Sequence, residues 1–161
     1  QINVSPVSRL TFTLSKLIPY WIIGLLVLTL AMVIAWVAYG LVPVGSIWII
    51  YVVTLLFSFV MSGLGVSIAN CSSTMQQSMY VMFFFIIIFQ LMSGLMTPID
   101  SMPQWAQYIT YVIPPRYFIE IMRSVYLKGS MFSELWQDFS MLAVFAVFVC
   151  LAAMITYKKQ S

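Results

Sequence analysis

The sequence has no histidine, only two cysteines and few charged side chains. Without histidine there is no His-based acid–base catalysis and no histidine metal site. Cys71 and Cys150 are far apart in the chain and form no Cys-x-x-Cys motif, so they are most simply small apolar side chains. Charged residues make up 7% of the chain, compared with about 25% in an average soluble domain. These shortages exclude a soluble enzyme, a soluble binding module, a disordered chain and a disulfide-stapled scaffold.

Two binding motifs are also missing. The sequence contains no G-x-x-x-x-G-K-[ST] motif, so this chain does not bind ATP through a P-loop of its own. Its basic residues form no run that could follow a phosphate backbone, so we expect no nucleic-acid partner. We therefore predict no catalytic residue, no metal and no cofactor bound by this chain.

Long apolar runs dominate what is present, since 63% of the residues are hydrophobic. No charged residue occurs between Lys16 and Asp100, although one membrane-spanning helix needs only about 20 residues. Breaks rich in Gly, Pro, Ser and Asn divide this stretch. The sequence therefore predicts an all-α integral membrane protein with four spans, at residues 20–39, 46–69, 77–96 and 139–157.

The charges at the two ends predict the orientation. Arg9 and Lys16 precede the first span, and Lys158 and Lys159 follow the last. Cytoplasmic segments carry an excess of Lys and Arg. We therefore expect both ends in the cytoplasm and the segment between the third and fourth spans outside.

Residues 5–17 have the pattern of a helix that lies on the membrane surface. Ser5 is a good N-cap, Pro6 suits the first helical position, and apolar residues then recur at helical spacing. Such a helix is either a passive anchor or a lever that transmits motion into the first span. In the second interpretation Pro6, Arg9 and Lys16 belong to the coupling element.

Residues 98–128 are too many for a turn and too apolar for an ordinary solvated loop. Pro103 is placed to begin a short helix, with Asp100 or Ser101 as its cap, and Pro114 follows its end. A second short helix is expected from Arg116 to about Leu127. Because neither helix is long enough to cross a bilayer, the sequence predicts a re-entrant hairpin before the last span.

The second short helix carries three charges on one face. Arg116 and Glu120 are four residues apart, and Glu120 and Arg123 are three apart. Tyr117 and Phe118 lie among the apolar residues beside them. The three charges are interpreted either as a clasp that holds the hairpin together or as groups that contact a substrate.

The spans themselves contain a few polar and small residues. Ser58 and Ser62, and Gly63 and Ser67, are small-x-x-x-small pairs, which favour close helix packing. Gln90 is the amide deep in the third span. It is interpreted either as an interhelical hydrogen-bond donor or as a lining residue of a translocation path.

Several motifs occur together in one order. They are MSGLMTPIDSMPQW at 92–105, PPRYFIEIMR at 114–123 and LKG at 127–129, after VSPVS at 4–8 and KLIPY at 16–20. In this order they resemble the C-terminal half of the permease subunit of type-2 ABC exporters. The likeness extends over nearly the whole chain.

The resemblance implies that residues 1–161 are the C-terminal part of a transmembrane domain with six spans. It also implies a homo- or heterodimer of permeases in a bacterial inner membrane, with partner ATPase subunits or domains that bind ATP and Mg. The expected activity is export of an amphipathic or hydrophobic substrate (drug, lipid or glycan-like) by alternating access. Gln90 would border the path, and the hairpin would be the outer gate, with Pro98, Pro103, Trp105, Pro114, Arg116, Tyr117, Phe118, Glu120 and Arg123.

Two other interpretations compete with this one. A self-contained four-span channel or membrane assembly factor would function without an ATPase. A membrane-embedded enzyme would need a nucleophile with a base, or a set of metal ligands, and the predicted spans provide neither.

Overall fold

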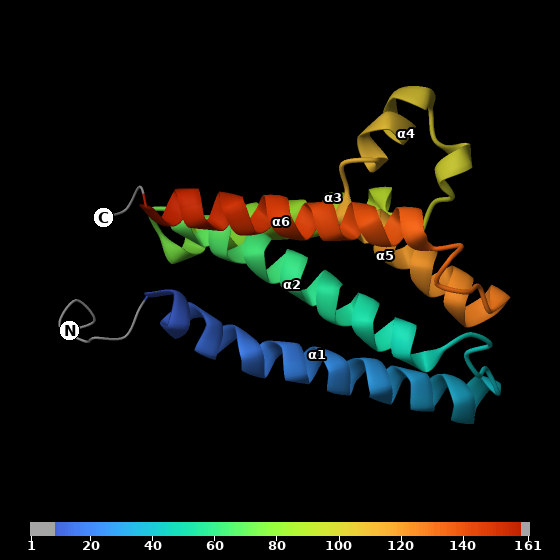
Figure 1. The fold of residues 1–161 in the computed structure, drawn as a ribbon. Coiled ribbons are helices and arrows are strands. Elements are labelled where there is room, and N and C mark those ends of the chain that lie inside the picture. Colours follow the sequence, from blue (N-terminus) through green and yellow to red (C-terminus); the bar gives the residue numbers. More distant parts are fainter. Residues whose placement is uncertain (1–8, 159–161) are drawn as a thin grey trace. The chain divides into compact units, whose positions relative to one another are not determined.

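The structure, a computed structural model, describes the backbone of residues 9–158 and the side chains of residues 15–156. Every regular element in this part of the chain is helical (Figure 1). The elements are α1 (Arg9–Tyr39), α2 (Ile47–Cys71), α3 (Met75–Met92), η2 (Ile99–Ser101), α4 (Gln104–Thr110), α5 (Pro114–Arg123), η3 (Ser124–Lys128) and α6 (Trp136–Lys158).

Four of these helices are long and apolar enough to span a membrane, which confirms the all-α class and the four predicted spans. The candidate spans are Ser15–Tyr39, Ile47–Cys71, Met75–Met92 and Trp136–Thr156. The third was predicted to reach residue 96, but α3 ends at Met92. Gly94 has a φ of +83°, a left-handed conformation that commonly follows a helix end and suits glycine. The backbone therefore leaves the helix earlier than the apolar pattern predicts.

The chain divides into two compact units, residues 1–41 and 42–161, and α1 lies in the first. This helix is continuous from Arg9 to Tyr39 with Pro19 inside it, so the predicted boundary between a surface helix at 5–17 and a span at 20–39 is wrong. Apolar helices tolerate an internal proline when nearby groups satisfy the freed carbonyl. Residues 5–8 lie outside the described residues, and a surface location for 9–17 stays a prediction.

The core of the second unit lies where α2, α5 and α6 pack together (Figure 1). Each of the three helices contributes fully or nearly fully buried side chains. These are Ile50, Val53 and Val60 on α2, Tyr117 and Ile121 on α5, and Leu142, Ala146 and Val149 on α6. α3 packs against α2 and α5 but buries none of its own residues.

Gly63 lies at a tight contact between α2 and α6. A Cβ atom at this position would overlap Cγ1 of Val149, whereas one at Gly65 would meet no atom within 4 Å. The serines near Gly63 satisfy their hydroxyl groups inside α2: Ser62 Oγ donates to Ser58 O at 2.7 Å, and Ser67 Oγ donates to Gly63 O at 2.8 Å. The predicted packing role is therefore confirmed at Gly63, while the two hydroxyls bond within their own helix.

Backbone hydrogen bonds join the connection before α2 to η3. The backbone N–H of Val44 donates to Tyr126 O at 3.2 Å, and that of Gly45 donates to Val125 O at 3.0 Å. A Cβ on Gly45 would lie 2.8 Å from the same Val125 oxygen. Gly129 follows η3 with a φ of +69°, and a Cβ on Gly129 would lie 2.8 Å from Cγ1 of Val44. Two glycines therefore permit an interlock between segments that are far apart in sequence.

Candidate functional site

The segment between α3 and α6 folds into the two short helices that the sequence predicts. α4 spans Gln104–Thr110, and α5 begins at Pro114, two residues before the expected start. Proline suits this first turn because the N–H groups there have no partner within the helix. Figure 1 shows α4 standing apart from the packed helices of its unit. Its insertion into the outer leaflet stays a prediction.

The predicted cap of α4 is wrong. The N-cap residue is Pro103, and neither Asp100 nor Ser101 caps this helix. Ser101 Oγ instead donates to Pro98 O at 2.6 Å, within η2. The Gln107 side chain donates to Met102 O at 2.9 Å and so fastens the start of α4.

Arg116 joins the end of α4 to the beginning of α5. Its Nη1 donates to Oγ1 of Thr110, a fully buried residue, and its guanidinium carbon lies 4.2 Å from the centre of the Tyr111 ring. Thr110 Oγ1 in turn donates to Gln107 O at 2.7 Å. The arginine thus forms a charged hydrogen bond and a cation–π contact across the α4–α5 turn.

The three charges on α5 do not form the predicted ionic clasp. Glu120 is exposed, and no ion pair joins it to Arg116 or Arg123 in the part of the chain that the structure describes. Arg123 Nη2 donates instead to Gly94 O at 3.2 Å. Both arginines therefore bind partners on other segments, and an exposed ion pair within one helix would contribute little by comparison.

Two aromatic residues attach α5 to its neighbours. Tyr117 is buried beside Phe145, and its hydroxyl donates to Tyr111 O at 2.9 Å. Burial raises the pKa of Tyr117 above its ordinary value of 10.0, so the hydroxyl remains a donor at neutral pH. Phe118 stacks on Phe57 of α2 with ring centres 4.3 Å apart. These contacts hold α5 between α2 and α6.

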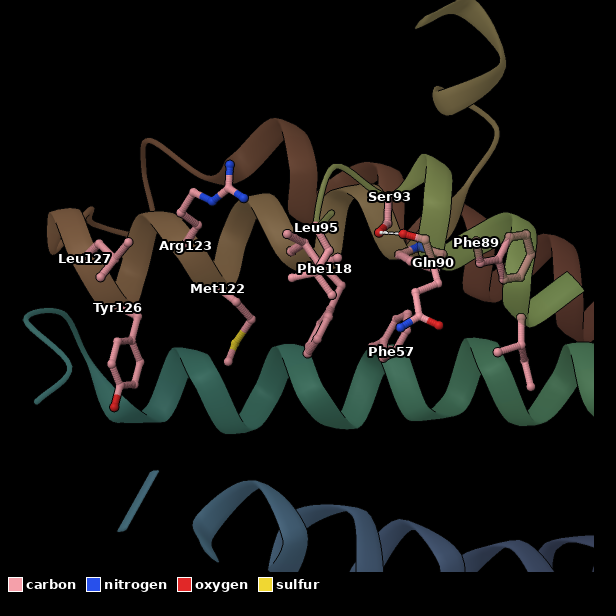
Figure 2. Close-up of a pocket in the computed structure, with 13 residues that line it drawn as sticks. Phe57, Phe89, Gln90, Ser93, Leu95, Phe118, Met122, Arg123, Tyr126 and Leu127 are labelled. Atoms are coloured by element: carbon pink, nitrogen blue, oxygen red, sulfur yellow. Dashed lines mark hydrogen bonds between the residues drawn. The ribbon is translucent and has the colours of Figure 1, made fainter. Parts of the chain in front are cut away.

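A groove of about 640 Å³ lies between α2, α3 and α5 (Figure 2). Most of its lining is apolar, and three phenylalanines contribute to it. The lining residues are Phe57, Ile86, Phe89, Gln90, Ser93, Leu95, Pro115, Phe118, Ile119, Met122, Arg123, Tyr126 and Leu127. Such a groove is suited to a ligand with a large apolar part and a small polar part.

The structure brings together three of the residues singled out from the sequence. Gln90, Phe118 and Arg123 all line the groove, although the first was assigned to a path and the others to a gate. Phe57 was missed, and its local sequence does not distinguish it from the other phenylalanines. Only its stacking on Phe118 in the folded chain distinguishes Phe57 as a residue of the groove.

The remaining predicted residues lie elsewhere. Pro98, Pro103 and Trp105 are exposed around η2 and α4. Lys16 is exposed on α1, Arg9 is described by its backbone alone, and Pro6 lies outside the described residues. Among the described residues, no three His, Cys, Asp or Glu side chains are grouped so that they could hold a metal ion.

Comparison with known proteins identifies the family to which this chain is similar. Residues 2–127 match the family model described as ABC-2 type transporter. The chain belongs to the ABC-2 type transporter family. This match includes the motifs at 92–105 and 114–123 and confirms the resemblance to type-2 ABC permeases.

Among the curated relatives of this ABC-2 transporter chain are three permeases of Escherichia coli. The probable multidrug ABC transporter permease YbhR is 29% identical over 86% of the chain, and the similarly named YbhS is 31% identical over 77%. The inner membrane transport permease YhhJ is 26% identical over 92%. The chain spans 38%, 33% and 40% of the lengths of these three relatives. No solved structure matches the chain.

Proposed function

We propose that this ABC-2 permease chain belongs to an ATP-driven exporter that moves an amphipathic or hydrophobic substrate (drug, lipid or glycan-like) out across a bacterial inner membrane. The observation that carries the proposal is the family match over residues 2–127. Relatives named multidrug permeases and an inner membrane transport permease support the substrate class and the location. The apolar groove beside Gln90 and Arg123 is consistent with an amphipathic substrate.

The proposed mechanism is alternating access by a homo- or heterodimer of permeases. This chain has no P-loop motif, so partner ATPase subunits or domains would bind ATP and Mg and drive the change. Both ends of the segment would face the cytoplasm, where the residues at 5–17 would receive the motion of the ATPases. The hairpin of η2, α4 and α5 would close the path on the outer side, with Gln90 bordering the path.

Purification of the full-length parent protein in mild detergent tests this proposal. We expect a P-loop ATPase in stoichiometric amount, either as a separate subunit or fused to the same chain, because residues 1–161 contain no P-loop motif that could bind the ATP. Mass spectrometry of the purified complex identifies the ATPase.

A transport assay provides the result that could contradict the exporter proposal. Proteoliposomes of the parent protein should accumulate a fluorescent amphipathic probe only when ATP and Mg are added. Ion flux without ATP, from a preparation that contains no ATPase, would contradict the exporter and support a self-contained channel.

A further inference from the structure

The groove between α2, α3 and α5 has one charged lining residue and is otherwise almost entirely apolar. Among the 13 residues that line it, Arg123 is the only charged residue and Gln90 the only amide. The hydroxyl of Ser93 is buried and already donates to Gln90 O at 3.1 Å. This lining therefore suits a ligand with an apolar body and a group that a guanidinium recognises.

Arg123 has N–H donors that could bind such a group. Its side chain is exposed, and Nη2 donates to Gly94 O at 3.2 Å, whereas a guanidinium carries five N–H donors. No carboxylate pairs with it within the part of the chain that the structure describes. An unpaired cation next to membrane-spanning helices is costly unless an anion approaches it, and a phosphate matches the guanidinium fork with two parallel hydrogen bonds.

The arrangement of the side chains separates a charged rim from an apolar interior. In Figure 2, Met122 and Tyr126 point from α5 and η3 toward α2, while Arg123 points away from α2. Phe57 and Phe118 stack in the interior. If α2 and α3 span the membrane, as their length and apolar composition indicate, the interior would lie beside the hydrocarbon of the bilayer, which is where lipid tails are found.

We propose that this groove binds a phospholipid of the surrounding bilayer, with its phosphate at Arg123 and one acyl chain against the apolar interior. The proposal does not depend on the direction of transport or on the exported substrate. A water-soluble phosphate would leave the apolar interior unfilled, and an uncharged apolar ligand would leave Arg123 unpaired. A phospholipid satisfies both parts of the groove at once.

Native mass spectrometry of the full-length protein with added phosphatidylglycerol tests the site. Arg123→Ala should weaken binding of the first lipid by about tenfold or more, since a charge-assisted hydrogen bond is lost. Arg123→Lys should weaken it less, because the charge remains while the fork is lost. Lys128→Ala is the matched control: it removes an exposed cation from η3 outside the groove and should leave the affinity unchanged.

Ile86→Trp tests the interior without changing any charge. Ile86 is 44% exposed on α3 and lines the groove, so the larger side chain should obstruct the acyl chain while the helix still folds. Lipid binding should fall, and inorganic phosphate at the same concentration should not displace phosphatidylglycerol. Equal losses in Arg123→Ala and Lys128→Ala, unchanged binding in Ile86→Trp, or displacement by inorganic phosphate would each overturn the proposal.

Discussion

Replacing Arg116 with alanine in the full-length transporter is expected to reduce export at least about tenfold. The substitution removes a hydrogen bond from a charged donor, worth about 1.5–3 kcal/mol, and a cation–π contact, worth about 0.5–2 kcal/mol. Both contacts join the end of α4 to the start of α5 through Thr110 and Tyr111. Without them the turn between the two helices loses its fixed geometry. If the hairpin is the outer gate, as proposed, the gate then closes poorly.

Transport of a fluorescent amphipathic probe by proteoliposomes, at matched protein content, measures this effect. Glu134→Ala is the internal control, because Glu134 is an exposed acid in the connection before α6 and lies outside the hairpin. It should leave export nearly unchanged. Full export by Arg116→Ala at normal membrane levels would show that the hairpin is not the gate.

Replacing Gly63 with alanine is expected to destabilise the protein by about 1–3 kcal/mol, the usual effect of an extra methyl group in a packed interface. The new Cβ would overlap Val149 and force α2 and α6 apart. This helix pair contains much of the core, including Ile50 and Leu142. Lipid cannot replace that close contact, because helix association in a membrane relies on packing.

Gly65→Ala is the matched comparison for Gly63→Ala. The two glycines lie two residues apart on α2, but a Cβ at Gly65 meets no atom within 4 Å. Thermal unfolding of the two purified variants in the same detergent should show a lower Tm only for Gly63→Ala. Equal Tm values for the two variants would mean that α2 and α6 do not pack as closely as the structure shows.

The four spans could be predicted because bilayer thickness sets the length of an apolar helix. The predicted bounds of α2 and α6 agree with the structure to within three residues. The sequence predicts a helix at 5–17 and a separate span at 20–39, whereas α1 is continuous through Pro19, because a proline inside an apolar helix does not have to end it. The early end of α3 depends on the conformation of Gly94, which the hydrophobic pattern does not contain.

The candidate site was harder to predict than the spans. Spacing along one helix places Arg116, Glu120 and Arg123 on one face of α5, but it does not determine their partners. Arg123 binds a carbonyl group 29 residues earlier in the chain, and Arg116 binds across a turn. Residues from α2, α3 and α5 together line the groove. Contacts of this kind depend on tertiary packing, so local periodicity gives no signal for them.

The interlock between Gly45 and η3 determines where a reporter group can be attached. An epitope or fluorophore inserted between Val44 and Gly45 would have to break the backbone hydrogen bonds to Val125 and Tyr126. The segment before α6 offers a better attachment point, because residues 131–134 are all exposed. Engineering for labelling or imaging should therefore use the connection before α6 and leave the connection before α2 intact.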